Sequence, residues 1–194
     1  MTPFMGCASV VRMKYEARTI DLVPEKRLVL RSPEAGDAEA LIDYLRAVCG
    51  ETEFLLCGAE EVTYTAAEER DFITAFLEDE RKLLLAVFDG ERAIADIGVE
   101  PVRDVAKMRH RAKIGISVRK EYWGRGIGSL LLREAERAAR RMGYERLELD
   151  VFAANSRALS LYERTGFVQC GCIPRAARLA DGSYSDEIYM TKVL

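Results

Sequence analysis

The 194-residue chain has little of what several classes of protein require. No apolar run approaches the roughly 18 residues that cross a membrane. Lys plus Arg (29) nearly balance Asp plus Glu (32), and the net charge of −3 is unlike the basic surface of a nucleic-acid-binding protein. We therefore expect neither a membrane nor a nucleic acid among its partners.

Histidine and cysteine are too scarce for a usual zinc site. The chain has one histidine, His110, and five cysteines, none of them in a Cys-x-x-Cys pair. An odd number of cysteines leaves one unpaired in any all-disulfide scheme, and no basic segment followed by an apolar stretch marks a secretory signal at the N-terminus. We therefore expect a cytoplasmic protein with reduced thiols and no bound metal.

Hydrophobic periodicity predicts helices and strands that alternate irregularly along the chain. Strands are predicted over 28–31, 83–88, 93–102, 113–118, 147–152, 167–173 and 184–193, and helices over 37–49, 65–77, 129–142 and 156–165. Hairpin turns and one strand–helix–strand crossover favour an α/β (α+β) fold with a mixed, mostly antiparallel, twisted sheet and flanking helices. Residues 1–26 lack clear periodicity and read as an N-terminal extension, either a tail or an added strand, to one domain over 27–194.

The stretch 122–129, Tyr-Trp-Gly-Arg-Gly-Ile-Gly-Ser, is the most informative part of the chain. It lies between a predicted strand and a long predicted helix. Three glycines within five residues let the backbone turn tightly and expose N–H groups where the positive end of a helix dipole begins. This arrangement is typical of a phosphate or pyrophosphate site. We therefore predict that a phosphorylated cofactor binds the main chain of Arg125, Gly126, Ile127, Gly128 and Ser129.

Two common glycine motifs fit this stretch poorly. A Walker-type loop needs Gly-Lys before Ser or Thr, and the chain has Ile127-Gly128 at that place. A dinucleotide fingerprint needs a third glycine where the chain has Ser129, and it begins directly after a strand. Here residues 119–123 separate the strand from the first glycine, so a nicotinamide-type cofactor is the weaker alternative.

A second motif lies downstream, in Asn155-x-x-Ala-x-x-Leu-Tyr162-x-x-x-Gly166-Phe167. It reads as a helix with an N-terminal cap at Asn155 and a stop at Gly166. With the glycine loop at this separation, the chain resembles the GNAT N-acetyltransferase superfamily, over roughly residues 27–194. The loop is similar to that of a branch with ribosomal-protein and polyamine acetyltransferases. One departure is Trp123, which stands where the family usually has Gln or Arg, so no phosphate ligand is expected from that side chain.

The resemblance implies a GNAT-like acyl-CoA N-acyltransferase fold in which two central strands splay apart around the cofactor. It implies acetyl-CoA as cosubstrate and a primary amine of a small molecule, peptide or protein as acceptor. Tyr162 matches the tyrosine that donates a proton to the CoA sulfur, although a packed aromatic side chain would have the same pattern. Ile116 and Val118 match main-chain positions that bind the pantetheine. Asn155 matches a cofactor ligand as well as a helix cap.

Several questions stay open at this level. The general base is undecided among Asp96, Glu100, Glu53 and Glu121, because Lys113 stands where some relatives carry a glutamate. His110 lies between two arginines and reads as part of a solvated connector. The acceptor pocket is expected from residues 50–64, from the strand ends near Glu100 and from a loop over 174–183, whose acidic residues favour a cationic amine. A non-catalytic acyl-CoA-binding or sensing module is the alternative function, and a homodimer is left open.

Overall fold

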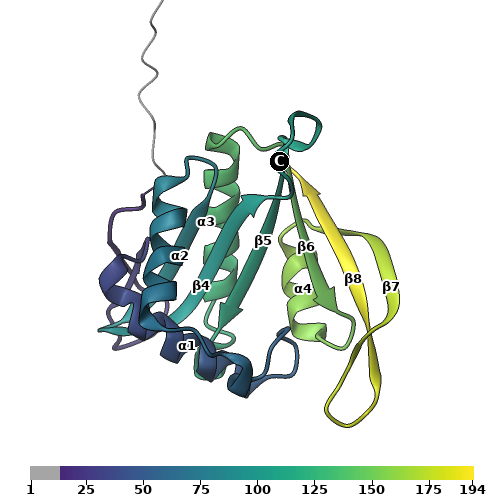
Figure 1. Ribbon diagram of the computed structural model, residues 1–194, viewed down its shortest axis with the longest axis horizontal. Coiled ribbons are helices and arrows are strands. Elements are labelled where there is room, and N and C mark those ends of the chain that lie inside the picture. Colours follow the sequence, from purple (N-terminus) through teal and green to yellow (C-terminus); the bar gives the residue numbers. More distant parts are fainter. Residues whose placement is uncertain (1–13) are drawn as a thin grey trace, which may run out of the picture.

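A computed structural model describes residues 14–194, and the part of the expected N-terminal extension before residue 14 lies outside the described residues. The chain forms an eight-stranded sheet in the order β1-β2-β3-β4-β5-β6-β8-β7 (Figure 1). The strands are β1 (Arg18–Ile20), β2 (Leu28–Arg31), β3 (Leu83–Asp89), β4 (Arg92–Pro101), β5 (Arg111–Val118), β6 (Arg146–Phe152), β7 (Val168–Arg178) and β8 (Tyr184–Val193). Of the described strand pairs, β5 and β6 are parallel and the others antiparallel. The predicted fold class is confirmed.

The helices cover both faces of the sheet (Figure 1). They are α1 (Ala38–Glu51), α2 (Ala66–Glu78), α3 (Ile127–Arg141) and α4 (Ser156–Arg164). The apolar sides of α1 and α2 form one core cluster with alternate residues of β3, such as Leu84 and Phe88. The apolar sides of α3 and α4 share the second cluster with the other face of the same strands. None of the helices formed by residues 14–194 is long and apolar enough to cross a membrane.

Local signals placed the starts of α1 and α2 as predicted, but the side-chain cap expected for α1 is absent. The Thr65 hydroxyl accepts the Glu68 N–H at 3.2 Å, and the Glu68 carboxylate accepts the Thr65 N–H at 2.8 Å, as a capping box requires. Asp37, predicted to cap α1, makes no side-chain cap. Its carboxylate instead binds Arg31 through two contacts of 2.6 and 2.7 Å, because a bidentate guanidinium pair is stronger than a single neutral N–H contact.

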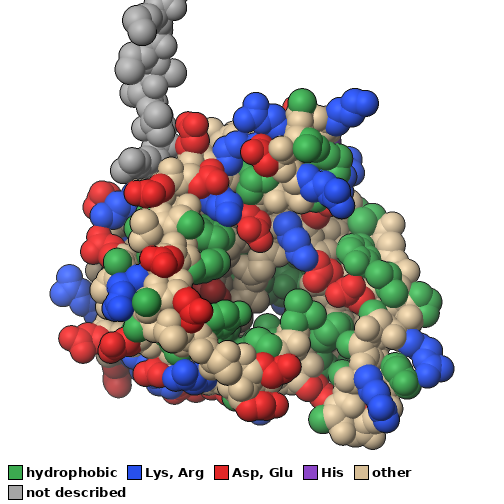
Figure 2. Space-filling model, viewed as in Figure 1, with side chains coloured by type: hydrophobic (Ala, Val, Ile, Leu, Met, Phe, Trp, Pro, Cys, Tyr) green, Lys and Arg blue, Asp and Glu red, His purple; other side chains and the backbone are tan. Residues whose placement is uncertain are grey.

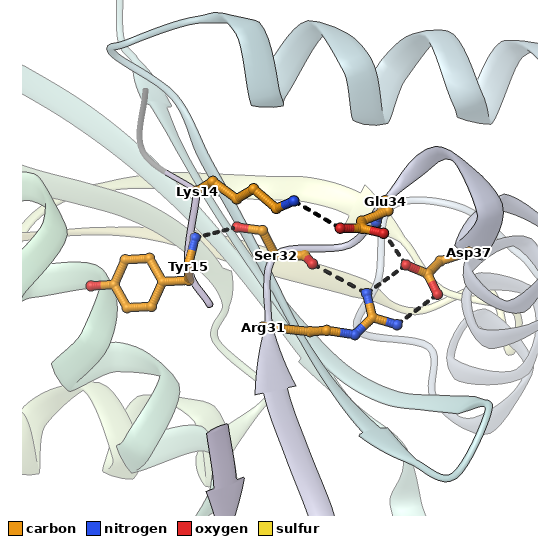
Figure 3. Close-up of polar contacts among 6 residues, drawn as sticks. All are labelled: Lys14, Tyr15, Arg31, Ser32, Glu34 and Asp37. Carbon is orange, nitrogen blue, oxygen red and sulfur yellow. Dashed lines mark hydrogen bonds and ion pairs between the residues drawn. The ribbon is translucent and has the colours of Figure 1, made fainter. Parts of the chain in front are cut away.

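A polar network around Asp37 attaches the segment before β1 to the end of β2 (Figure 3). The Lys14 ammonium lies 2.8 Å from the Glu34 carboxylate, and the Tyr15 N–H donates to the Ser32 hydroxyl at 3.1 Å. β1 then pairs with β2 from Arg18↔Leu30 to Ile20↔Leu28. Residues 14–26 therefore add an edge strand to the same sheet.

The strand β7 runs further than its sequence pattern predicted. Residues 174–178, expected to begin a loop, belong to the strand, whose pairing with β8 is irregular between Ile173 and Ala177. Pro174 has no N–H to donate, and Arg175 has a left-handed backbone with φ of 53°. This interruption hides the alternation by which a strand is recognised.

The feature that positions the site is the separation of β5 and β6. Their pairing covers Arg111–Lys113 and Arg146–Glu148, although β5 continues to Val118 and β6 to Phe152. The two arrows diverge beyond that point in Figure 1. The sheet is thus split at its centre, on the side from which the chain passes into α3.

Candidate active site

The main chain of β5 faces the gap with polar groups that β4 does not use. The Arg119 N–H donates to the Ile94 carbonyl at 2.9 Å, which makes these two residues a hydrogen-bonded pair. In antiparallel strands, bonded and non-bonded pairs alternate, so Ala95↔Val118 and Ile97↔Ile116 are non-bonded pairs on either side of the bonded pair Asp96↔Ser117. The N–H and C=O groups of Val118 and Ile116 therefore point away from β4 and toward β6.

The glycine loop brings the start of α3 to the mouth of this gap. Gly124 and Gly126 have φ of 74° and 82°, a left-handed backbone that glycine adopts at little cost. Gly126 is the N-cap, and α3 begins at Ile127, two residues before the predicted Ser129. The N–H groups of the first turn have no partner within the helix. They are available to an anion.

The α4 helix forms the opposite wall. The Asn155 side-chain oxygen accepts the Ala158 N–H at 3.1 Å, so Asn155 is a cap, and the cap leaves its amide NH₂ group available for a ligand. A β-carbon added to Gly128 would lie 2.9 Å from Leu161 Cδ2. The glycine therefore permits a close approach of α3 to α4.

These elements surround a cleft of about 450 Å³. It brings together all but one of the predicted site residues, namely Ile116, Val118, Gly126, Ile127, Gly128, Ser129, Asn155 and Tyr162. Arg125 is exposed and is not among the residues that line the cleft. Of the segment 50–64, Thr52, Phe54 and Leu55 contribute to the wall, whereas Glu100 and residues 174–183 do not.

Trp123 and Arg157 line the cleft as well, and sequence reasoning assigned neither a role there. The Trp123 indole N–H donates to the Val118 carbonyl at 2.7 Å, so Trp123 holds the glycine loop against the end of β5. The Arg157 guanidinium lies 4.8 Å from the Trp123 ring, a cation–π contact that spans the gap from α4. The sequence could have indicated both residues, because Trp123 adjoins the glycine loop and Arg157 adjoins the Asn155 cap.

Tyr162 is buried, and its ring meets Phe167 edge-on at 5.9 Å between centroids. Burial, and secondarily the negative charge of Asp150, raises the pKa of the Tyr162 hydroxyl to about 12. The hydroxyl therefore keeps its proton throughout the neutral range. In this position it can act as a proton donor.

The face of the sheet toward α1 and α2 carries a second row of polar side chains. Two glycines, Gly98 and Gly115, lie opposite each other in the register, with Glu100 and Lys113 opposite each other on one side of them. The Lys113 ammonium lies 2.6 Å from the Asp150 carboxylate across the gap, and this contact raises the pKa of Lys113. Figure 2 shows this face hollowed between the helices and the β7–β8 hairpin, with charged side chains of both signs around the hollow.

The cysteine thiols of the described residues do not line the cleft. Cys49, Cys57, Cys170 and Cys172 are free, and the Cys49 and Cys57 sulfur atoms lie 3.2 Å apart. Burial and the contact with Cys57 raise the pKa of the Cys49 thiol to about 12. Within residues 14–194, no group of three or more His, Cys, Asp or Glu side chains could hold a metal ion.

Comparison with known proteins identifies one family. The model of the acetyltransferase (GNAT) family matches residues 40–167. The chain is 33% identical to the L-amino acid N-acetyltransferase AaaT of Escherichia coli (strain K12) over 113 residues, which cover 58% of this chain and 68% of that protein. It is 26% identical to the putative phosphinothricin acetyltransferase YwnH of Bacillus subtilis (strain 168) over 159 residues, 82% of this chain and 94% of that protein.

A solved structure supports the same likeness. The crystal structure of an acetyltransferase of the GNAT family from Streptococcus pneumoniae superimposes with a TM-score of 0.82 at 30% identity. The alignment covers 87% of this chain and 100% of that one. The split sheet, the glycine loop and α4 thus belong to a fold that known acetyltransferases share.

Proposed function

The chain belongs to the acetyltransferase (GNAT) family, and from this premise we propose that its acceptor is an amino acid or a small amino-acid-like molecule. It is an acetyl-CoA-dependent N-acetyltransferase, and the likeness to named N-acetyltransferases favours catalysis over the non-catalytic acyl-CoA-binding module. The acceptor class, the cofactor contacts and the roles of individual residues are the further content of the proposal.

The cleft residues fit the cosubstrate that this family uses. We place the pyrophosphate at the first N–H groups of α3, and the pantetheine along the main chain of Ile116 and Val118. Because Trp123 occupies the Val118 carbonyl, the groups that remain for the pantetheine are the Val118 N–H and both groups of Ile116. When bound, acetyl-CoA supplies a thioester, an acyl group activated for attack by an amine.

Tyr162 is the proposed acid. A thiolate with a pKa near 8.5 leaves more easily when a neighbouring group protonates it. Tyr162 reaches the cleft from α4 and holds its proton at neutral pH because its pKa is about 12. The Asn155 amide NH₂ group, at the N-terminus of the same helix, is the proposed donor to the cofactor arm.

The single observation that carries the acceptor class is the pairing of charges along the hollow face. An amino acid presents an ammonium group and a carboxylate, and this face presents Glu100 and Asp150 together with Lys113. Two relatives agree with this class by name, since one acts on L-amino acids and the other is a putative phosphinothricin acetyltransferase. A polyamine has no anionic group, so it would offer the Lys113 ammonium no carboxylate to bind.

A panel of acceptors tests this proposal. CoA thiol release would be measured with L-amino acids, with the amines that remain when their carboxylate is removed, with polyamines and with peptides. We expect the best amino acid to exceed its decarboxylated counterpart by at least about tenfold in kcat/KM, because a hydrogen bond to a charged group contributes about 1.5–3 kcal/mol. Lys113→Met should narrow that ratio. A polyamine or a decarboxylated amine as the best acceptor would overturn the assignment.

The free thiols bear on the location of the protein. We propose a cytoplasmic enzyme, since the cysteines of the described residues form no disulfide and proteins of oxidising compartments usually pair theirs.

A further inference from the structure

Three oxygen atoms from three elements form a closed triangle beside the cleft. The Asp96 carboxylate of β4 accepts the Ser117 hydroxyl of β5 at 2.7 Å and the Tyr44 hydroxyl of α1 at 2.9 Å. The two hydroxyl oxygens are themselves 2.6 Å apart. Asp96 and Ser117 are partly exposed and face each other in the register, while Tyr44 is buried behind them.

This triangle lacks one proton when Asp96 is ionised. Each of its three contacts is within hydrogen-bond distance and needs a proton, but Ser117 and Tyr44 carry one each and a carboxylate carries none. If both hydroxyls donate to Asp96, their oxygens face each other at 2.6 Å without a proton between them. One added proton completes a ring in which every oxygen donates once and accepts once. The cluster is therefore arranged to take up a single proton.

Ser117 connects this cluster to the reaction. Ser117 lines the same cleft as Tyr162 and the glycine loop. The other acids considered as bases lack such an arrangement. Glu121 pairs with Arg92 at 2.7 Å on the surface, and Glu53 and Glu100 are exposed.

We propose that Asp96 accepts the proton of the acceptor ammonium through the Ser117 hydroxyl, with Tyr44 closing the ring. This inference rests on the acetyl transfer to an amine given above and is independent of which amine is used. Ser117 is the group nearest the substrate, and Tyr44 positions the carboxylate.

The proton balance of the step is complete. An ammonium proton passes to Ser117 Oγ while the Ser117 proton passes to Asp96, which leaves the nitrogen lone pair free. That pair forms the C–N bond to the acetyl carbon, the C–S bond breaks, and its electrons stay on sulfur, which takes the Tyr162 proton. The nitrogen loses its second proton to solvent, Asp96 later releases its own, and solvent restores Tyr162. One proton is released for each acetyl group transferred.

The surroundings of Asp96 adjust its proton affinity. From α1 it faces Tyr44 and Cys49, and from α2 it faces Glu69, whose pKa is raised by burial and by the Asp96 charge. From β5 it faces Ser117, and beyond it lies the buried Arg119, whose guanidinium is 5.7 Å from the Tyr44 ring. Loss of solvent raises the pKa of Asp96, and the contacts with the Ser117 and Tyr44 hydroxyls partly offset this rise. The basic form is therefore present above this raised pKa and disappears as the pH falls through it.

The pH profile of kcat/KM tests the assignment with the best amine in the acceptor panel, whatever its class. In Asp96→Asn we expect a loss of about 10²–10⁴-fold at neutral pH, and the acidic limb that the Asp96 pKa sets should be replaced by one at higher pH. The remaining rate should rise with pH, because only acceptor deprotonated by solvent reacts. Calorimetric CoA affinity should stay within about threefold of the wild type, since Asp96 does not line the cleft.

Three further variants keep the test decisive. Ser117→Ala should lower kcat/KM, and Ser117→Thr, which retains a hydroxyl, should restore most of it. If Asp96→Asn does not fold, this pair of variants tests the inference in its place. Asp37→Asn makes the same chemical change at a structural carboxylate and should leave kcat/KM within about twofold. An Asp96→Asn enzyme that keeps wild-type kcat/KM and its acidic limb would overturn the inference, whereas an incorrect acceptor class would appear in the wild-type panel alone.

Discussion

Replacing Tyr162 by Phe is expected to lower turnover by about 10²–10⁴-fold, the usual contribution of a positioned proton donor. The variant keeps the ring that packs against Phe167 and removes only the hydroxyl. With a pKa of about 12, that hydroxyl is protonated at every pH of an ordinary assay, so its loss should lower the whole pH profile without moving its limbs. CoA affinity should change little, because the proposed proton transfer occurs after binding.

Tyr144→Phe is the matched control. Tyr144 is also a buried tyrosine, but its hydroxyl donates to the Arg81 carbonyl at 2.7 Å, and it does not line the cleft. Its loss should reduce the free energy of unfolding by about 1 kcal/mol and leave turnover unchanged. If Tyr162→Phe lowers kcat by less than about threefold, the sulfur obtains its proton elsewhere and Tyr162 is mainly a packing residue.

Gly126→Glu is expected to abolish measurable CoA binding. The substitution forces a β-carbon onto a backbone with φ of 82° and places a negative charge at the N-terminus of α3, where the pyrophosphate is proposed to lie. Loss of two charge-assisted contacts alone would weaken affinity by at least about 100-fold. Gly126→Ala, which adds strain without charge, should fall between this variant and the wild type in calorimetry.

The other end of the same helix provides the control. Gly143 also has a left-handed backbone, with φ of 80°, and a β-carbon there would meet nothing within 4 Å. Gly143→Glu thus imposes comparable strain and the same charge far from the glycine loop. Its CoA affinity should equal that of the wild type. Equal weakening in both glutamate variants would mean that α3 is merely destabilised and that the loop does not hold the cofactor.

Much of the fold was predictable because local signals and burial agree. The strands over 28–31 and 184–193 have the predicted bounds, and the Thr65–Glu68 capping box fixes the start of α2. The glycine loop and the Asn155 motif located most of the cleft, since both depend on residues close in sequence.

The remaining parts depend on contacts between distant residues. Asp37 has the chemistry of a cap for α1, but its carboxylate binds Arg31, six residues earlier, and the Glu34 N–H instead. The indole of Trp123 reads as a departure from the family loop until its contact with Val118 is known. Likewise, Asp96 was one acid among four, because only the register of β4 and β5 and the packing of α1 bring Ser117 and Tyr44 to it. Single-sequence patterns do not encode these pairings.

The most direct test of the central claim is to follow an isotopically labelled acetyl group from acetyl-CoA to an L-amino acid by mass spectrometry. The account predicts a labelled N-acetylamino acid in an amount equal to the thiol released, with none formed by Gly126→Glu. Thiol release without any labelled amide, in the presence of amino acids and of every other amine tried, would contradict it.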